Sequence, residues 1–237
     1  MFRSYVTNDN VVELCLTLGL CSEGITQLNS LMTPRKGVKK GESLFNQGER
    51  LESLYAIRSG FFKTTMTTKE GKEQVSGFQM MGEMLGMDAI STEHHTSSAI
   101  ALVDSVVYGV DFSQLQQLGR EFPALQRNFM KLMSDEIVHS RTVLLMMGTM
   151  NSDERLAAFL LNLSGRFALR GYSPISFILR MRREDIASYL GLRMETICRA
   201  VTRLREMSLA NLSGRDVEIV NLPGLKDHVA GFSRQRV

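Results

Sequence analysis

The sequence predicts an α+β fold made of a small antiparallel β-barrel of the jelly-roll type, a long coiled-coil helix and a winged helix-turn-helix. Three observations predict these parts in turn. Glycines divide the first half into short segments, a heptad-spaced apolar stripe follows, and two short amphipathic helices flank a single glycine. With 237 residues, 43% apolar and 22% charged, the chain has the composition of a globular protein with one large or two modest domains.

The barrel is predicted between about Thr33 and Asp111, where glycines recur at positions 37, 41, 48, 60, 71, 77, 82, 86 and 109. Short apolar or alternating segments lie between them, about 8–12 residues apart, which is typical of a small all-β unit. We expect hairpin turns at Ser59-Gly60 and at Glu70-Gly71. The clearest strand segments are Ser53–Arg58, Phe61–Met66 and Val103–Tyr108.

A change of period at Phe122-Pro123 predicts a long helix, because proline is favoured at the first helical position. An apolar stripe then advances by alternating steps of three and four residues, which is the seam of a two-helix coiled coil. We expect two copies of this helix to pair, and packing of the stripe on the chain's own barrel is the alternative. The seam consists of Met130, Met133, Ile137, Ser140, Leu144 and Met147.

The next helix is predicted to begin at Asn151, which can cap it while Glu154 bonds back to the Asn151 backbone, a variant of the capping box. Pro174 ends the helical pattern within the loop Gly171–Pro174. The chain from Asn151 onward carries 14 Lys and Arg against 9 Asp and Glu, and 13 of these 14 cations are arginine. Since the arginine fork matches phosphates and guanine, this half has the charge of a nucleic-acid-binding domain, although a solvated basic face has the same composition.

The stretch Arg182–Met207 predicts a helix-turn-helix. One short helix, Arg183–Leu190, and a second, Met194–Met207, are joined at Gly191. In this motif the second helix enters the major groove of DNA with its outward residues. These residues are Arg193, Glu195, Thr196, Arg199 and, further along, Arg203.

Two residues of the second helix can recognise bases directly. Glu195 and Arg199 share a helix face; a carboxylate accepts from cytosine N4, and a guanidinium pairs with guanine O6 and N7. Residues 209–212 and 217–220 then predict a hairpin, the wing, with Arg215 placed to contact phosphate.

With these parts the chain resembles the CRP/FNR family of bacterial transcription regulators, in its FNR branch, from about Lys36 to Asp227. The resemblance is strong in five stretches: Ser53–Gly60, Asp88–Ile90 with His94-His95, Asp153–Phe159, Tyr189–Leu192 and Glu195–Ile197. It implies a barrel of the cyclic-nucleotide-binding type and a homodimeric activator or repressor that binds double-stranded DNA and contacts RNA polymerase. It also implies a palindrome with TTGAT-type half-sites, in which Glu195 and Arg199 recognise the inner TGA bases. Cys198 stands where the FNR branch has serine, so we count it among the DNA-binding residues.

The resemblance divides the chain into four regions. These are an N-terminal region, a sensor-like barrel, a dimerisation helix and a winged helix-turn-helix DNA-binding domain. We expect them at residues 1–30, 31–121, 122–150 and 151–237.

The FNR branch holds a [4Fe–4S] cluster through four cysteines, and this chain departs from that pattern. Cys15 and Cys21 keep the C-x5-C spacing, but Val12 and Tyr108 stand where the other two ligands are expected. We therefore expect no conventional cluster. Two alternatives stay open: ordinary thiols on an amphipathic N-terminal helix, and a redox- or effector-responsive regulator that uses Cys15 and Cys21 or an unknown barrel ligand.

Cyclic AMP is not expected as a ligand either. Where cyclic-nucleotide barrels carry a glutamate and an arginine, this chain has Met87 and Ser97, and a buried phosphate without its cation is costly. Ser140 replaces an acid in the seam whose like-charge repulsion keeps the cluster-free FNR form apart. We expect a constitutive dimer.

Other classes of function are not supported by the residues. The sequence has no P-loop, dinucleotide fingerprint, nucleophile elbow or H-E-x-x-H motif, so we expect no enzyme. His94 and His95 are expected in a surface turn rather than at a metal site. Three cysteines make no disulfide framework and no apolar run approaches the roughly 20 residues that span a bilayer, so we expect a cytoplasmic protein without a membrane partner.

Overall fold

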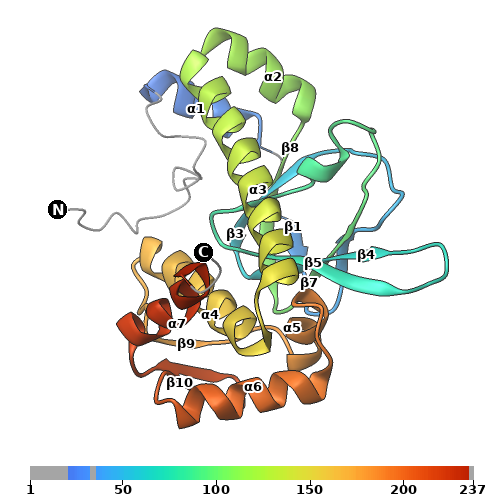
Figure 1. Cartoon of the computed structure of the whole chain (residues 1–237). Helices are drawn as coiled ribbons and strands as arrows, with labels where there is room; N and C mark the ends of the chain where they lie inside the picture. Colours follow the sequence, from blue (N-terminus) through green and yellow to red (C-terminus); the bar gives the residue numbers. More distant parts are fainter. Residues whose placement is uncertain (1–20, 33–35, 235–237) are drawn as a thin grey trace. The chain divides into compact units, whose positions relative to one another are not determined.

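The computed structural model of the chain describes residues 21–32 and 36–234. Its contacts divide the chain into two compact units, residues 1–138 and 139–237, with the boundary inside one long helix. The α+β fold predicted from the sequence is confirmed, with a β-domain, a long helix and a C-terminal helix-turn-helix that carries a small sheet (Figure 1).

The β-domain consists of two four-stranded antiparallel sheets, in the orders β1-β8-β3-β6 and β2-β7-β4-β5. Their inner faces enclose a core that includes Phe45, Ile57 and Phe62, all at most 5% exposed. The strands are β1 (Lys36–Val38), β2 (Ser43–Phe45), β3 (Leu54–Ser59), β4 (Phe61–Thr67), β5 (Glu73–Met80), β6 (Met84–Leu85), β7 (Ser98–Ala101) and β8 (Ser105–Val110).

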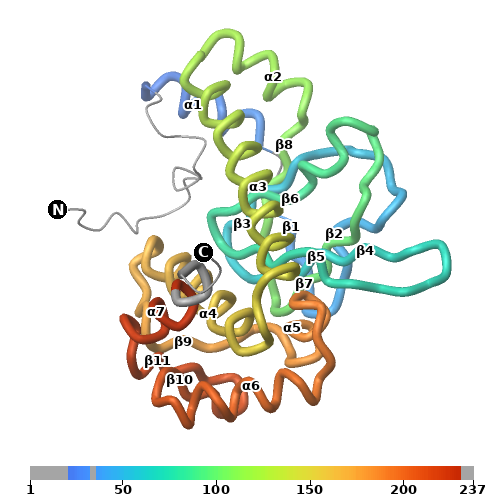
Figure 2. The backbone as a smooth tube through the Cα atoms, viewed as in Figure 1, coloured from blue at the N-terminus to red at the C-terminus, as the bar shows by residue number. Residues whose placement is uncertain are grey.

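The hairpin expected at Ser59-Gly60 is wrong, because β3 and β4 lie in different sheets. Gly60 instead carries the chain from one sheet to the other with φ of +110°, and a Cβ there would lie 2.0 Å from Oγ of Ser105. Only glycine fits this crossing. The hairpin at Glu70-Gly71 is confirmed: β4 pairs with β5, and Figure 2 shows the two strands running out together to their turn.

Three helices of the first unit pack on the apolar cluster that includes Leu28, Leu54 and Leu125. They are α1 (Ser22–Ser30), α2 (Phe112–Glu121) and the first part of α3 (Pro123–Thr149). Asp111 caps α2, since its carboxylate accepts from the Ser113 hydroxyl and from the Gln114 amide. These two bonds lower the pKa of Asp111, the Ser113 bond more strongly.

The second unit contains the end of α3 and the helices α4 (Ser152–Leu169), α5 (Arg183–Tyr189), α6 (Met194–Glu206) and α7 (Leu222–Arg234). The predicted capping box is confirmed: the Asn151 carboxamide accepts from the amides of Asp153 and Glu154, and the Glu154 carboxylate accepts from the Asn151 amide at 2.8 Å.

The wing is confirmed as β10 (Ala210–Ser213) paired with β11 (Asp216–Ile219). A third strand, β9 (Ser176–Ile178), extends this sheet beside β11, and α7 follows it. Neither β9 nor α7 was expected. β9 has only three residues and buries Phe177 alone, so it offers too little alternation for a sequence pattern to detect.

Candidate DNA-binding surface

Helix α6 has one buried face and one exposed face. Ile197, Ala200 and Leu204 are at most 1% exposed and attach the helix to the rest of the second unit. The preceding helix α5 buries Ile186, Ala187 and Leu190, as the sequence predicts. This arrangement leaves the opposite face of α6 open to a ligand.

The turn before α6 depends on Gly191, whose φ of +62° is in the left-handed region that favours glycine. Arg155, in the first turn of α4, holds this turn in place. Its guanidinium donates to three backbone carbonyls: Met147 at 2.6 Å, Met150 at 3.0 Å and Leu190 at 3.1 Å. Three segments therefore meet at one side chain: the end of α3, the link to α4 and the end of α5.

A second bond joins the same parts of the unit. The Tyr189 hydroxyl of α5 and Nε2 of His139 in α3 lie 3.3 Å apart, within hydrogen-bond reach. Sequence reasoning missed Arg155 and Tyr189 as positioning residues, because a lone arginine in the first turn of a helix carries no signal of its partners.

The predicted DNA-binding residues lie together along α6. Arg193 is its N-cap, is exposed and makes no side-chain capping bond. Glu195 and Arg199 are exposed, and Nη2 of Arg199 donates to the Thr196 hydroxyl at 3.4 Å. Cys198 is half-buried.

Arg203 is already engaged within the protein. Its Nη2 donates to Oδ1 of Asp153 and, at 2.9 Å, to the Ser152 hydroxyl. The bond to Asp153 raises the pKa of Arg203, although the guanidinium side chain stays 44% exposed. With its α6 neighbours it lines an open depression of about 330 Å³, formed by Cys198, Arg199, Thr202 and Arg203.

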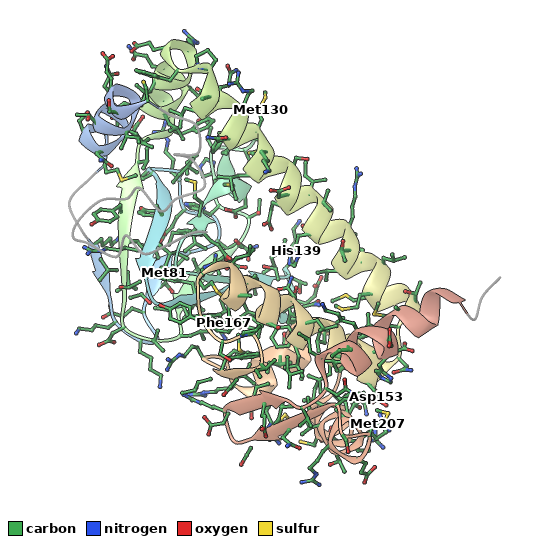
Figure 3. The ribbon with its side chains drawn as sticks, turned by 90° about the vertical axis from the view of Figure 1, so that its left-hand side faces the viewer. Met81, Met130, His139, Asp153, Phe167 and Met207 are labelled. Carbon is green, nitrogen blue, oxygen red and sulfur yellow. The ribbon has the colours of Figure 1, made fainter. Side chains whose placement is uncertain are left out.

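The seam predicted on α3 presents an apolar row to solvent. Met130, Ile137 and Leu144 are spaced seven residues apart and are 64%, 51% and 69% exposed. Met133 and Met147 are half-buried, and Ser140 is exposed. Figure 3 shows Met130 on the exposed side of α3.

The cysteines are spread over the chain. Cys21 is exposed at the N-cap of α1 and forms no disulfide, whereas Cys15 lies outside the described residues. Tyr108, at the barrel position of the fourth cluster ligand, is buried, and its hydroxyl accepts from Nη1 of Arg58 at 3.2 Å. Cys198 belongs to α6, where Nη1 of Arg183 lies 3.9 Å from its sulfur.

The surface position expected for His94 and His95 is confirmed for His94, which is exposed, and wrong for His95. His95 is only 3% exposed, and its ring stacks on that of Phe45 with centroids 3.7 Å apart. Its Nδ1 lies 3.4 Å from Oδ1 of Asp88. Oδ2 of Asp88 accepts from the amides and the hydroxyls of both Thr96 and Ser97, at 2.8–3.0 Å. A carboxylate of the chain thus satisfies the donors around Ser97, where cyclic-nucleotide barrels carry an arginine.

Two absences concern only the described part of the chain. Within residues 21–32 and 36–234, no three His, Cys, Asp or Glu side chains are grouped so that they could bind a metal ion. Among the helices of this same part, none has the length and apolar character needed to cross a membrane.

Comparison with known families gives two matches that follow the two units. Residues 35–122 match the model of the cyclic nucleotide-binding domain, and residues 154–228 match that of the Crp-like helix-turn-helix domain.

Curated relatives are similar over nearly the whole chain. The chain is 42% identical to the fumarate nitrate reduction regulatory protein of Klebsiella oxytoca and 40% identical to that of Escherichia coli K12. Each alignment covers 95% of this chain and 90% of the relative.

Solved structures agree on the architecture. FixK2 from Bradyrhizobium japonicum has a TM-score of 0.74 and 27% identity, over 83% of this chain and 96% of that one. A CooA variant from Carboxydothermus hydrogenoformans has a TM-score of 0.71 and 20% identity, over 95% and 98%, and shares the fold.

Proposed function

This chain belongs to the CRP/FNR family of DNA-binding transcription regulators, and we propose from this premise that it binds an FNR-like palindrome as a homodimer. The observation that carries the proposal is the exposed face of α6. Glu195 and Arg199 lie there one turn apart, in the N-terminal part of α6. This is the part of the second helix that contacts base edges in the major groove in this motif.

The two side chains complement a TTGAT-type half-site. The Glu195 carboxylate accepts from cytosine N4 on one strand, and the Arg199 fork donates to O6 and N7 of a guanine. The bond from Arg199 to Thr196 supports this role, because it directs the guanidinium along the helix toward its N-terminal end. We assign phosphate contacts to Arg193 and Arg203, and we count Cys198, which precedes Arg199 on the helix, with the DNA-binding residues.

A palindrome requires two copies of α6 with two-fold symmetry. The exposed seam of α3 supports a second copy of the chain as its partner, since Met130, Ile137 and Leu144 repeat every seven residues. Ser140 places no carboxylate in this seam, so the dimer has no like-charge repulsion to overcome there. We propose that it is constitutive.

The regulator works without a conventional [4Fe–4S] cluster or cyclic AMP. Tyr108 offers a phenol already bonded to Arg58 where a thiolate is needed, so the described residues do not fit the cluster. The amide and the hydroxyl of Ser97 already donate to the Asp88 carboxylate, and the negative charge of this carboxylate would repel a cyclic phosphate. The barrel therefore does not fit cyclic AMP either.

Transcriptional control requires a contact with RNA polymerase, which we propose for the second unit. Exposed apolar side chains lie between the last residue of α4 and the end of β9, away from the predicted DNA-binding residues of α6: Leu169, Tyr172, Ile175 and Ile178 are 46–86% exposed. A regulator that contacts both DNA and polymerase acts in the bacterial cytoplasm.

The test is fluorescence anisotropy with a labelled duplex that carries two TTGAT half-sites, with a scrambled duplex of equal length as the control. We expect binding to the palindrome at least about a thousandfold tighter than to the scrambled duplex, the usual lower range for specific sites. Equal affinity for the two duplexes would refute the proposal.

A further inference from the structure

The pair formed by Asp153 and Arg203 joins the start of α4 to the exposed side of α6. The N-terminus of α4 is already capped by Asn151 and Glu154. The hydrogen bonds of the Asp153 carboxylate go to two side chains: it accepts from the Ser152 hydroxyl at 3.1 Å and from Arg203.

The position of Arg203 on α6 indicates which part of DNA it reaches. Each step of four residues turns an α-helix by about 40° beyond a full circle and advances it by about 6 Å. Arg203 is two such steps beyond Glu195, so it lies about 12 Å further along the axis and about 80° around it. If the groove floor is where Glu195 points, as the proposed function has it, Arg203 faces the wall of the groove, where the phosphates are.

Arg203 consequently has two acceptors for one guanidinium: the internal carboxylate of Asp153 and an external phosphate. Carboxylate and phosphate are both strong charge-assisted acceptors for the arginine fork. The Asp153 side chain is 15% exposed and that of Arg203 is 44% exposed, so the pair is open to solvent on the arginine side and a phosphate can compete for it.

We propose that Asp153 lowers the affinity of this protein for the DNA backbone by competing with phosphate for Arg203. The inference rests on the proposed function, since it concerns the same DNA surface. Phosphate contacts carry no sequence information. Asp153 therefore sets how tightly the dimer holds any DNA, and Glu195 and Arg199 set which sequence it prefers.

The test compares the wild type with Asp153→Asn, Arg203→Ala and the double variant on the palindromic and scrambled duplexes between 50 and 200 mM KCl. Asp227→Asn, an exposed site on α7, is the control that removes the same charge from the same unit. Each phosphate contact contributes about 0.9 to the slope of log K against log salt, so the two Arg203 side chains of a dimer account for about 1.8 in all. In the wild type they make part of this contribution because Asp153 competes for them. Asp153→Asn therefore steepens the slope by the missing part, and Arg203→Ala flattens it by the part already made.

We expect Asp153→Asn to tighten binding to both duplexes by the same factor, about two- to fivefold per subunit for an exposed pair. In the Arg203→Ala background the Asp153 change has no effect, and Arg203→Ala alone flattens the salt slope. Asp227→Asn changes the slope less than Asp153→Asn does.

Three results would overturn the inference: weaker binding by Asp153→Asn, an unchanged salt slope, or an Arg203→Ala slope equal to that of the wild type. They would make the pair a structural tie between α4 and α6. The scrambled duplex separates this inference from the proposed function, because it measures backbone affinity whether or not the palindrome is preferred.

Discussion

Arg155 is expected to be a main source of stability in the second unit, and Arg155→Ala measures its contribution. The variant removes three hydrogen bonds from one guanidinium to the carbonyls of Met147, Met150 and Leu190. Bonds to a charged group contribute about 1.5–3 kcal/mol each when shielded. Arg155 is half-buried and water replaces part of the loss, so we expect a cost of about 3 kcal/mol in the free energy of unfolding.

The assay is urea unfolding followed by circular dichroism, with thermal unfolding beside it. For a unit of this size about 3 kcal/mol lowers Tm by at least about 10 °C. Arg155→Lys keeps the charge, but a single ammonium cannot face three carbonyls as the planar fork does, so it recovers only part of the loss.

The matched control is Lys226→Ala, which removes an exposed cation from α7 and stays within about 0.5 kcal/mol of the wild type. A loss below about 1 kcal/mol for Arg155→Ala, or one equal to that of the control, would refute the role assigned to these three bonds.

Three further predictions concern other parts of the chain. Arg199→Ala costs about 1–3 kcal/mol on the palindrome and relaxes the preference at one guanine in anisotropy titrations, and an equal loss on every sequence would contradict its base contact. Leu144→Glu places a charge in the α3 seam and gives a monomer at micromolar concentration in light scattering, whereas an intact dimer would contradict the seam. The lowered pKa of Asp111 means that its carboxylate stabilises the fold above its ordinary pKa and that this contribution is lost as pH falls through the lowered value. The stability difference between the wild type and Asp111→Ala in urea should therefore shrink toward low pH, and a constant difference would argue against the cap.

Local patterns predicted the elements that depend on neighbouring residues. The capping box at Asn151, the glycine turn at 191 and the wing follow from spacings of two to four residues, and the structure has all of them. The heptad spacing likewise predicted α3, because a 27-residue helix gives many repeats of one pattern.

Long-range features were not accessible in this way. The sequence around Gly60 resembles a hairpin turn, and only the strand pairing shows that the chain crosses between two sheets there. The residue that requires glycine at this crossing, Ser105, is 45 positions away in the chain. His95 is buried by Phe45, and Asp153 engages Arg203 from 50 positions away. From the sequence, His95 and Asp153 are known only as polar residues, and their contacts with Phe45 and Arg203 are not predictable.

We expect this chain to bind an FNR-like palindrome through α6 without an oxygen-labile cluster. Its affinity for the TTGAT-type duplex, measured in air and under anaerobic conditions on protein purified anaerobically, tests both parts of this expectation. We expect a colourless protein with the same affinity in both. A brown protein that absorbs at about 420 nm, as Fe–S clusters do, and that loses specific binding in air would contradict this expectation.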